Sequence, residues 1–392
     1  MCPFGTPDHL DCLPEPDEGT PVVPDLTRST VFEFGSRRQF LRGEEGEPAG
    51  HFYPRYGHVN GLHLEALTAS LERAGGSVSF ASGMAASSAV FLALLEQGDR
   101  LALSTRCYGG VLALASHELP RFGIGVLRFD PFDPGQVDEV LSASPKLVHV
   151  ETPVNPTVRV IDLPPLAERV HGAGALLCVD ATFLPPPFQR VLELGADLSI
   201  HSATKFLGGH TDVLAGVASG GVELMEKLEG HRRRTGAVLA ADLAWLLIRS
   251  LKTLELRVRA QCETARQLAG WLEAEAPNVG KVHYPGLASH PDHDVASRNQ
   301  ALFGSMLSFE VHGGHEAAWR VFDGFDLFRK APSLGGVESL VCLPADSSHR
   351  MLTEEEQRAA GFGPGTIRLS VGLEPLEELR EDLLAALRGR IP

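Results

Sequence analysis

Residues 61–216 alternate short apolar runs with longer amphipathic stretches, and this alternation constrains the fold more than any other feature of the chain. Strands that alternate with helices predict βαβ units and a mostly parallel sheet with helices on both faces. In such sheets ligands bind where the strands end. The expected strands are 78–80, 101–103, 125–129, 147–150, 176–179 and 197–200, and the expected helices between them are 84–97, 110–118, 135–143, 162–172 and 188–194.

The two ends of the chain differ in character from this region. Residues 1–60 are rich in proline, glycine and charge, and we expect an arm that a neighbouring subunit holds in place. Residues 61–255 are expected to form a large domain, and residues 256–392 a smaller domain that mixes strands with helices. Thr353 with Glu356 three residues later predicts a helix that starts with a capping box.

The composition excludes several classes of protein. Lys and Arg number 35 against 50 Asp and Glu, so the net charge is −15, which disfavours nucleic acid and anionic membranes as partners. No apolar run approaches the ~18 residues of a membrane span. The six cysteines form no CxxC pair, which is typical of a reducing compartment. Because the N-terminus also lacks a secretory pattern, we expect a cytoplasmic globular protein.

The most informative stretch is DLSIHSATKFLGGHTDVLAG at 197–216, where a buried strand is followed by a lysine between hydroxyl residues and then by glycines. Lysine is costly to bury unless its amine is neutral or covalently used. Ser202 and Thr204 offer hydroxyls to a phosphate beside Lys205. One interpretation is a lysine that condenses with a phosphorylated aldehyde, pyridoxal 5'-phosphate (PLP). A surface lysine in a glycine-rich turn is the alternative, and this stretch alone does not separate the two.

Three other strand ends supply matching parts. Asp180 and Thr182 follow a buried run, and a buried carboxylate there would keep a pyridine nitrogen protonated, although such an acid also commonly caps a helix. Gly83 and Met84 open a helix whose free N–H groups would hold a phosphate, which is weak evidence alone. Tyr108 lies beside a flexible turn and could stack on a cofactor, but a single tyrosine is more often a packing residue.

Taken together, the motifs resemble the Cys/Met-metabolism family of PLP enzymes of fold type I, over roughly residues 20–390. This family includes cystathionine γ-synthase, cystathionine γ-lyase, cystathionine β-lyase and methionine γ-lyase. The resemblance implies a seven-stranded, mostly parallel sheet flanked by helices, with a smaller α+β C-terminal domain. Its motifs are YPRYG at 53–57, ASGMAA at 81–86, ETPVNP at 151–156, HSATKFLGGHTDVLAG at 201–216, RSLKTLELR at 249–257, VHYPGLASHPDH at 282–293, SLGGVESL at 333–340 and IRLSVGLE at 367–374.

The resemblance implies roles for individual residues. Lys205 would bind the cofactor covalently and move protons, Asp180 would pair with the pyridine nitrogen, and Tyr108 would stack on the ring. Arg368 would hold the substrate carboxylate. The family is usually a tetramer, a dimer of dimers. The remaining roles that the resemblance implies are of three kinds. Contacts with the cofactor are implied for Asn155, Thr182, Gly83, Met84, Ser202 and Thr204, and Tyr53 and Arg55 would reach the cofactor from a neighbouring subunit, with Tyr53 also near the chemistry. Contacts with the substrate are implied for Asn155, Ser333 and Glu338.

Several details of the motifs bear on the reaction. Glu338 lies in a form of the SLGGVESL motif that resembles cystathionine-handling members, although a local salt bridge is the simpler reading. Gly110 stands where methionine γ-lyases typically have a cysteine. The resemblance therefore favours γ-replacement, in which an O-activated homoserine ester and L-cysteine give cystathionine. Elimination by a γ-lyase, a β-lyase or a methionine γ-lyase is the alternative, and a non-catalytic PLP-binding protein remains a third possibility.

Two departures from the family affect the substrate side. His58-Val59-Asn60 replaces Asn-Pro-Thr beside the arm residues. Ala113 replaces an arginine found in synthases that use succinyl esters. This replacement favours the O-acetyl ester over the O-succinyl ester as the substrate, and it also favours γ-lyase activity. The cluster His290-Pro291-Asp292-His293 has zinc-ligand residue types, but the family carries such a loop without metal, so we expect none. The expected partners are small amino-acid substrates and further copies of the chain.

Overall fold

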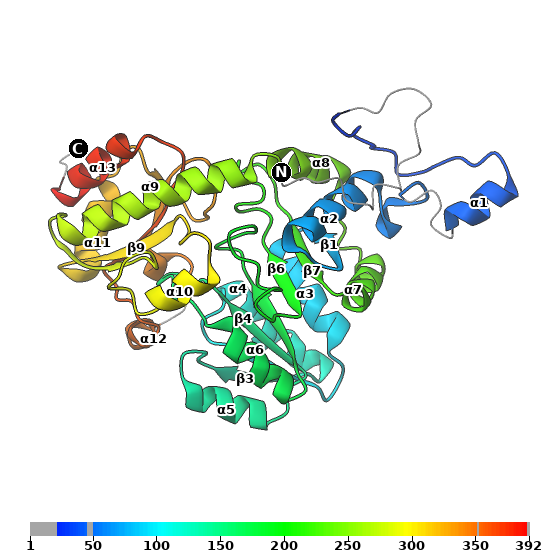
Figure 1. The fold of residues 1–392 in the computed structure, drawn as a ribbon, viewed down its shortest axis with the longest axis horizontal. Coiled ribbons are helices and arrows are strands. Elements are labelled where there is room, and N and C mark those ends of the chain that lie inside the picture. Colours follow the sequence, from blue (N-terminus) through cyan, green and yellow to red (C-terminus); the bar gives the residue numbers. More distant parts are fainter. Residues whose placement is uncertain (1–21, 45–49, 351–352, 390–392) are drawn as a thin grey trace.

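A computed structural model describes residues 22–44, 50–350 and 353–389 (Figure 1). Two sheets organise the molecule, one of seven strands in the order β1-β7-β6-β5-β4-β2-β3 and one of five in the order β10-β11-β12-β9-β8. Only β7 of the larger sheet is antiparallel to its neighbours, so the expected mostly parallel sheet is confirmed. The strands of this sheet are β1 (Gly76–Phe80), β2 (Arg100–Ser104), β3 (Gly125–Phe129), β4 (Leu147–Glu151), β5 (Leu176–Asp180), β6 (Leu198–His201) and β7 (Gly216–Gly220).

The strands of the large sheet form because both of their faces are covered. Every residue of β4 is buried, as are the three central residues of β5, which suits their apolar composition. Strand β7 was missed by the sequence analysis because its residues GVASG are small and carry almost no apolar signal. It is nevertheless buried throughout, between β1 and β6.

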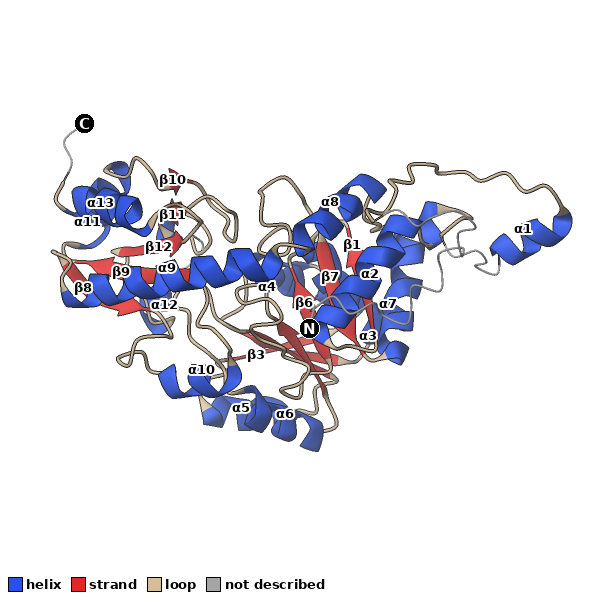
Figure 2. Ribbon diagram, turned by 45° about the horizontal axis from the view of Figure 1, so that its top comes forward, coloured by secondary structure: helices blue, strands red, loops and turns tan. Residues whose placement is uncertain are grey.

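Helices cover the large sheet on both faces (Figures 1 and 2). Buried residues of α3 (Gly83–Leu94) and α4 (Gly109–His117) pack in one cluster with Phe80 and Leu101. Those of α5 (Pro134–Ser142) and α6 (Leu163–Gly172) pack in another with Val150. Helix α8 (Ala241–Leu251) adds buried apolar residues to a third cluster that includes Val217 of β7. The expected α/β layers are therefore present.

The helix expected at 188–194 is wrong. Residues 191–195 form successive turns, in which Leu194 N bonds to Val191 O at 3.1 Å and Gly195 N to Leu192 O at 3.2 Å. Pro185, Pro186 and Pro187 occupy the preceding positions and supply no N–H groups, so a helix has little room to begin before Gly195 ends the segment with a φ of +99°.

The smaller sheet carries its own core. Apolar residues of β9, β12 and the long helix α9 form one cluster with α11 and α13, and the capping box of α12 is present as expected. No described helix is long and apolar enough to cross a membrane. The elements are α7 (Val222–Thr235), α9 (Leu254–Ala274), β8 (Val279–His283), α10 (His293–Asn299), β9 (Met306–Val311), α11 (Gly314–Asp323), β10 (Arg329–Lys330), β11 (Leu340–Cys342), η4 (Pro344–Asp346), α12 (Glu354–Ala359), β12 (Thr366–Ser370) and α13 (Leu376–Leu387).

The N-terminal arm leaves the body of the molecule and carries α1 (Arg37–Glu44) away from both sheets (Figure 1). It returns through the short helix η2 (Pro54–Tyr56) to α2 (Val59–Glu72), which packs against β1 and α8. A further short helix, η3 (Leu119–Phe122), follows α4. The domain boundaries at residues 60 and 255 stay predictions.

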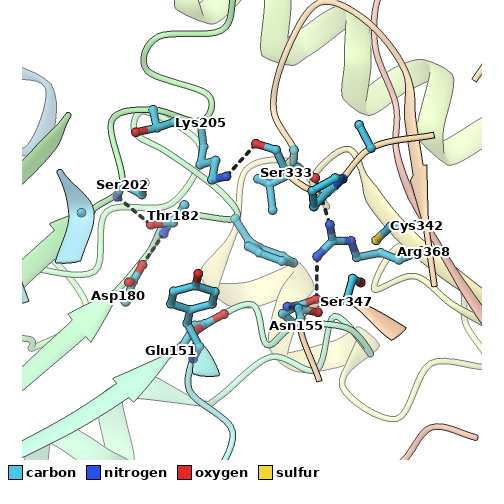
Figure 3. A pocket seen from close by; sticks show the side chains of 18 of the residues that line it. Glu151, Asn155, Asp180, Thr182, Ser202, Lys205, Ser333, Cys342, Ser347 and Arg368 are labelled. Atoms are coloured by element: carbon cyan, nitrogen blue, oxygen red, sulfur yellow. Dashed lines mark hydrogen bonds between the residues drawn. The ribbon is translucent and has the colours of Figure 1, made fainter. Parts of the chain in front are cut away.

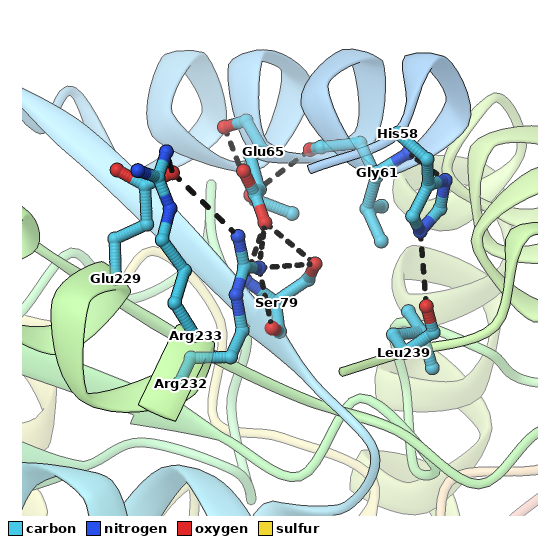
Figure 4. Close-up of polar contacts among 10 residues, drawn as sticks. His58, Gly61, Glu65, Ser79, Glu229, Arg232, Arg233 and Leu239 are labelled. Carbon is cyan, nitrogen blue, oxygen red and sulfur yellow. Dashed lines mark hydrogen bonds and ion pairs between the residues drawn. The ribbon is translucent and has the colours of Figure 1, made fainter. Parts of the chain in front are cut away.

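The departure at residues 58–60 is explained by the start of α2 (Figure 4). His58 caps the helix, because its Nδ1 accepts a hydrogen bond from Gly61 N at 3.0 Å. Its Nε2 lies 2.9 Å from Leu239 O, and a carbonyl only accepts, so the ring is neutral with its proton on Nε2. Asn60 donates to Asp25 O at 2.8 Å and accepts from Thr27 N at 3.0 Å, which ties the arm to α2.

A buried ion pair holds α2, β1 and α7 together (Figure 4). Arg232 of α7 is 3% exposed and contacts the carboxylate of Glu65 on α2. The same guanidinium donates to Ser79 O on β1 at 2.8 Å, and Ser79 N donates to Glu65 at 2.9 Å. Arg232 is the first of three consecutive arginines, at 232–234, and its role here is structural. Its neighbour Arg233 pairs with Glu229.

Candidate active site

The carboxyl ends of β4, β5 and β6 bring polar residues together, as the sequence predicts. Glu151 and Asp180, the last residues of β4 and β5, lie opposite each other in the parallel register. Asp180 Oδ1 accepts from Thr182 N at 2.9 Å, and Thr182 Oγ1 accepts from Ser202 N at 2.8 Å (Figure 3). These bonds connect the loop after β5 to the loop after β6.

Lys205 is presented by a tight turn after β6. Lys205 N bonds to Ser202 O at 3.0 Å, and Gly209 N bonds to Lys205 O at 2.7 Å. Gly209 has a φ of +70°, and a Cβ there would lie 1.9 Å from Arg257 Nη1, so both its conformation and its surroundings require glycine. The glycines after the lysine are therefore structural, and they hold the turn that carries Lys205.

Ser333 joins the lysine to Arg368 (Figure 3). Lys205 Nζ donates to Ser333 Oγ at 2.6 Å, while Arg368 Nη2 donates to Ser333 O at 2.9 Å. Ser333 has a φ of +105°, a strained conformation for a residue with a side chain, of the kind that clusters at functional sites. Arg368 Nη1 also donates to Asn155 Oδ1 at 3.0 Å. Ser333 therefore contacts the amine of Lys205 through its hydroxyl and the guanidinium of Arg368 through its carbonyl.

Burial sets the protonation of these groups. Burial, and then the nearby Arg368, lowers the pKa of Lys205 to about 8. Burial raises the pKa of Asp180, and burial together with the charge of Asp180 raises the pKa of Glu151 well above its ordinary value. Two neighbouring carboxyl groups with raised pKa values do not both ionise easily. A cation placed next to Asp180 would therefore stabilise its carboxylate form.

The start of α3 forms a cradle suited to a phosphate. Ser82 caps this helix, and its side chain accepts from Ala85 N at 3.1 Å. A Cβ on Gly83 would lie 2.8 Å from Ser202 Cβ, so glycine is needed for the helix end to approach the Ser202 loop. The free N–H groups of the first turn and the helix dipole favour an anion here. Thr204 lies in the same loop, where its hydroxyl accepts from Ala215 N at 3.1 Å and donates to Ala215 O at 3.2 Å.

Tyr108 is half exposed at the start of α4, and its N–H donates to Glu151 Oε2 at 2.8 Å. A Cβ on Gly110 would lie 2.6 Å from Tyr108 Cε1 and 3.0 Å from Met84 Sδ. Because Gly110 has no side chain, the Tyr108 ring and the Met84 sulfur can both lie close to position 110. Any larger residue there, cysteine included, would have to shift the ring.

One cavity of about 810 Å³ contains these groups. Its volume lies within the range typical of ligand sites. Eleven of the fourteen site residues predicted from the sequence line it, which are Gly83, Met84, Tyr108, Asn155, Asp180, Thr182, Ser202, Thr204, Lys205, Ser333 and Arg368.

The other three predicted residues lie elsewhere in the chain. Tyr53 and Arg55 belong to the arm, where the Arg55 guanidinium lies 5.5 Å from the centre of the Tyr53 ring and donates to Arg233 O at 2.8 Å. They do not line the cavity of their own chain. Glu338 does not line it either, and its Oε2 is buried with no hydrogen-bond partner among the described residues.

The sequence analysis missed several residues of the cavity wall. Glu151 opens the ETPVNP motif, but it had no assigned role, and only its burial beside Asp180 marks it out. Trp319, Lys330 and Asp346 come from the smaller domain and line the same cavity. No local motif signals them, because α11, β10 and η4 approach the site only through tertiary packing.

The remaining sequence signals have structural explanations. Ala113 is exposed on α4 outside the cavity lining. Arg106, a cation close in sequence to Ala113, pairs with Asp130. Asp292 pairs with Arg159 and accepts from Val160 N at 2.9 Å, while His290 Nε2 lies 3.4 Å from Thr157 O. Within 22–44, 50–350 and 353–389, no three His, Cys, Asp or Glu side chains are grouped so that they could hold a metal ion.

The residues present fit PLP. The cradle at Gly83 suits a phosphate, the buried carboxyl of Asp180 needs a cation such as a pyridinium, and Lys205 offers an amine of lowered pKa to an aldehyde. The fold and the donor set thus define a class, that of α/β enzymes that bind a phosphorylated aldehyde cofactor at the carboxyl ends of a parallel sheet.

Comparison with known proteins identifies the family. Residues 11–388 match the model of the Cys/Met metabolism PLP-dependent enzyme family, and the chain belongs to that family. It is 38% identical over 368 residues to an L-methionine γ-lyase of Fusobacterium nucleatum, covering 93% of each chain. It is 40% identical over 351 residues to the cystathionine γ-lyase of Bacillus subtilis, covering 89% of this chain and 92% of the relative.

The solved structure of cystathionine γ-synthase from Xanthomonas oryzae in complex with cystathionine also matches, with a TM-score of 0.88 and 38% identity. The match covers 94% of this chain and 93% of the other. The fold and the dependence on PLP therefore follow from the family, whereas these relatives differ among themselves in their reactions.

Proposed function

We propose that the protein is a cystathionine γ-synthase, which joins an O-acetyl or O-succinyl ester of L-homoserine to L-cysteine and releases the free acid. The likeness to the cystathionine-bound synthase of Xanthomonas oryzae supports this choice. Gly110 also supports it, because a cysteine at this position, typical of methionine γ-lyases, would require the Tyr108 ring to move.

The observation that carries the proposal is the bridge from Lys205 through Ser333 to Arg368. An α-amino acid has its nitrogen and its carboxylate on one carbon. With the carboxylate held by the Arg368 fork, the α-carbon would lie within reach of Lys205 Nζ. The strained Ser333 fixes both groups, so the geometry needed for proton transfer is set before the substrate arrives.

Each residue then has a defined task. When bound, PLP supplies an electron sink that makes the protons of the α- and β-carbons acidic. Lys205 Nζ would take and return those protons, and its pKa of about 8 is well matched to transfer near neutral pH. Asp180 would pair with the pyridine nitrogen, Tyr108 would cover the ring, and Ser202, Thr204 and the first turn of α3 would hold the phosphate.

We propose in addition that two chains share each site. Tyr53 and Arg55 lie on the arm, outside the cavity of their own chain, and Tyr53 is 43% exposed. An exposed tyrosine next to a partly exposed arginine suits recognition of a phosphate in a second subunit. A dimer of such pairs would give the tetramer that the sequence resemblance implies.

Elimination of cystathionine by a γ-lyase is the second candidate. The Bacillus subtilis γ-lyase is 40% identical over 351 residues, and the exposed Ala113 provides no cation for a succinyl group. The same lysine and arginine would serve both reactions, since each begins with loss of the α-proton.

A single set of incubations separates the candidates. The holoenzyme is given O-acetyl- or O-succinyl-L-homoserine with and without L-cysteine, and separately L-cystathionine. Cystathionine made from an ester and cysteine supports the synthase. Release of 2-oxobutanoate and cysteine from cystathionine, without synthesis in the first assay, would replace it by the γ-lyase. Turnover of L-methionine alone would contradict both.

A further inference from the structure

The guanidinium of Arg368 depends on two neighbours for its orientation. Arg368 is 5% exposed, and its Nη2 donates to Ser333 O at 2.9 Å while its Nη1 donates to Asn155 Oδ1 at 3.0 Å (Figure 3). Ser333 offers a backbone carbonyl, whose position the chain fixes. Asn155 offers a side-chain amide, which can rotate and present either its oxygen or its NH2 group. The residues that set the orientation of this amide therefore bear on Arg368.

Ser348 orients the Asn155 amide. Asn155 Nδ2 donates to Ser348 Oγ at 3.3 Å. If the amide were turned over, its NH2 group would face the Arg368 guanidinium, which has no acceptor atom. Ser348 lines the cavity, and its carbonyl lies close to the start of α4, because a Cβ on Gly109 would be 3.3 Å from Ser348 O. The Ser348 hydroxyl thus accepts from Asn155 and keeps its own proton for another partner.

His349 is that partner. Its Nδ1 lies 2.8 Å from Ser348 Oγ, and a ring nitrogen without a proton accepts from the hydroxyl. Burial, and then the charge of Arg368, lowers the pKa of His349 to about 4, although a hydrogen bond to the Asn155 backbone opposes this shift. The ring is therefore neutral at neutral pH, and its Nδ1 can accept. The hydrogen bonds then run in one direction, from the guanidinium through the amide and the hydroxyl to the imidazole.

His349 acts from outside the cavity. It is not among the residues that line the cavity, whereas Ser348 is. The imidazole meets the ring of Phe362, which is 2% exposed, edge to face with centroids 5.2 Å apart, and His349 N donates to Pro344 O at 2.9 Å. These contacts hold the imidazole in place, so its effect on a bound molecule would pass through Ser348 and Asn155.

We propose that His349 is a positioning residue for the group that holds the substrate carboxylate. It fixes the hydroxyl of Ser348, the hydroxyl keeps the Asn155 oxygen turned toward Arg368, and the guanidinium stays aligned for a carboxylate. This inference rests on the proposed role of Arg368. It applies to any α-amino acid, since every such substrate carries the same carboxylate.

Two ligands that differ only in the carboxylate test this assignment. L-Alanine has an α-carboxylate and no γ-substituent to lose, and ethylamine is the same molecule without the carboxylate. Each is titrated into the holoenzyme, and binding is followed by the visible absorbance of the cofactor. His349→Phe keeps an aromatic ring beside Phe362 but removes the acceptor, and it should raise the Kd of L-alanine about tenfold. The Kd of ethylamine should stay within about twofold of wild type.

A conservative variant and a control separate this role from a general loss of structure. His349→Asn offers an amide oxygen in place of Nδ1 and should bring the Kd of L-alanine back to within about threefold of wild type. Ser348→Ala removes the same link without changing the ring, so it serves as the test if His349→Phe does not fold, and it should also raise this Kd about tenfold. His117→Phe, at the exposed end of α4 outside the cavity lining, should leave both Kd values unchanged.

Unchanged L-alanine binding in His349→Phe or in Ser348→Ala, or an equal loss of ethylamine binding, would overturn the inference. Arg368→Gln is the reference for the carboxylate contact and should weaken L-alanine binding more than either variant. Normal L-alanine binding in Arg368→Gln would contradict the proposed role of Arg368 and the inference with it. A loss in Arg368→Gln without a loss in His349→Phe contradicts the positioning role alone. If the expected binding pattern is found but the protein joins no homoserine ester to cysteine, only the proposed reaction fails.

Discussion

At the scale of single residues, the site depends on groups whose protonation the protein has shifted. Asp180 is partly buried and its pKa is raised, so its ionised form in the apoprotein is unfavourable unless a cation lies beside it. Glu151 lies opposite Asp180 in the strand register, and burial together with the charge of Asp180 raises the pKa of Glu151 well above its ordinary value. A raised pKa means that Glu151 keeps its proton to a higher pH than a free carboxyl group does. We infer that the protonated form serves Tyr108 N–H as a hydrogen-bond acceptor without adding a second negative charge.

This inference predicts the effect of Glu151→Gln on the stability of the apoprotein. Glutamine keeps an oxygen for Tyr108 N–H but never ionises. Above pH 4.5 the unfolded wild-type chain loses the Glu151 proton while the folded chain retains it, so wild-type stability falls as pH rises. The variant should therefore unfold at higher urea than wild type near neutral pH and at a similar concentration near pH 4.

Glu378→Gln, on the exposed face of α13, is the control for this experiment and should behave as wild type at both pH values. A Glu151→Gln apoprotein that is less stable than wild type near neutral pH would mean that Glu151 is ionised in the fold.

Residues with a chemical signature were predictable, and those placed only by packing were not. Lys205 stood out because hydroxyls and glycines flank it after a buried strand, and Asp180 because it ends a strand. The need for Gly83 and Gly209 follows from close approaches to Ser202 and Arg257 that no local pattern reveals. Trp319, Lys330 and Asp346 lie in a region with no motif, and only the tertiary fold brings them to the cavity.

At the scale of elements, helix α2 shows how a departure from the family pattern is accommodated. His58 replaces the usual asparagine as the N-cap, and its second ring nitrogen reaches Leu239 O, which ties α2 to the segment before α8. The bond from Gly61 N requires the neutral ring, whereas a protonated ring would still donate to Leu239 O. Burial lowers the pKa of His58 below 6.5, and the bond to Leu239 O opposes this shift. Glu65 raises this pKa and Arg232 lowers it, and both effects are smaller than that of burial.

The His58 cap should therefore weaken in acid. As pH falls below 6.5 the unfolded histidine gains a proton that the folded ring resists, so stability is lost on the acid side. His58→Ala should cost about 1 kcal/mol near pH 7.5 through loss of the cap. His58→Asn should keep an acceptor for Gly61 N and lose less stability than wild type between about pH 7.5 and 5.5, measured by chemical denaturation.

Other buried histidines, such as His149 and His349, contribute the same acid sensitivity to wild type and variant, so only the difference between the two reports on His58. Identical pH dependence in wild type and His58→Asn would contradict the assigned cap.

Elements with strong apolar signals were predicted well, and elements without them were not. The strand expected at 125–129 coincides with β3, and those expected at 147–150 and 176–179 fall within β4 and β5. Strand β7 consists of small residues, and the apolar residues of the turn-rich connection at 188–194 are spaced as they would be in a helix. In both cases tertiary contacts, rather than local preference, decide the conformation.

At the scale of the whole molecule, residues from both sheets and their connections line one cavity. The arm extends away from both sheets (Figure 1). Residues after 255 supply Ser333, Arg368, Trp319, Lys330 and Asp346, while the larger sheet and its loops supply the lysine and the strand-end acids. Tyr53 and Arg55 of the arm do not line the cavity of their own chain, which is why we propose shared sites.

Shared sites predict recovery of activity in mixed oligomers. Lys205→Ala lacks the lysine, and Arg55→Ala lacks the residue lent to the neighbour, so each protein alone should be nearly inactive. After subunit exchange half of the dimers would be mixed and each would hold one intact site, giving about a quarter of wild-type activity. Absence of recovery, with exchange confirmed by differently tagged subunits, would contradict the shared site.

The central claim is that Lys205 binds PLP covalently beside Asp180. Borohydride reduction of the holoenzyme followed by peptide mass spectrometry tests it directly, because reduction fixes the cofactor on whichever lysine holds it. The account predicts the pyridoxyl group on the peptide that contains Lys205, and no fixed cofactor in Lys205→Ala. A pyridoxyl group on another lysine of the wild-type chain, or unchanged labelling of the variant, would contradict it.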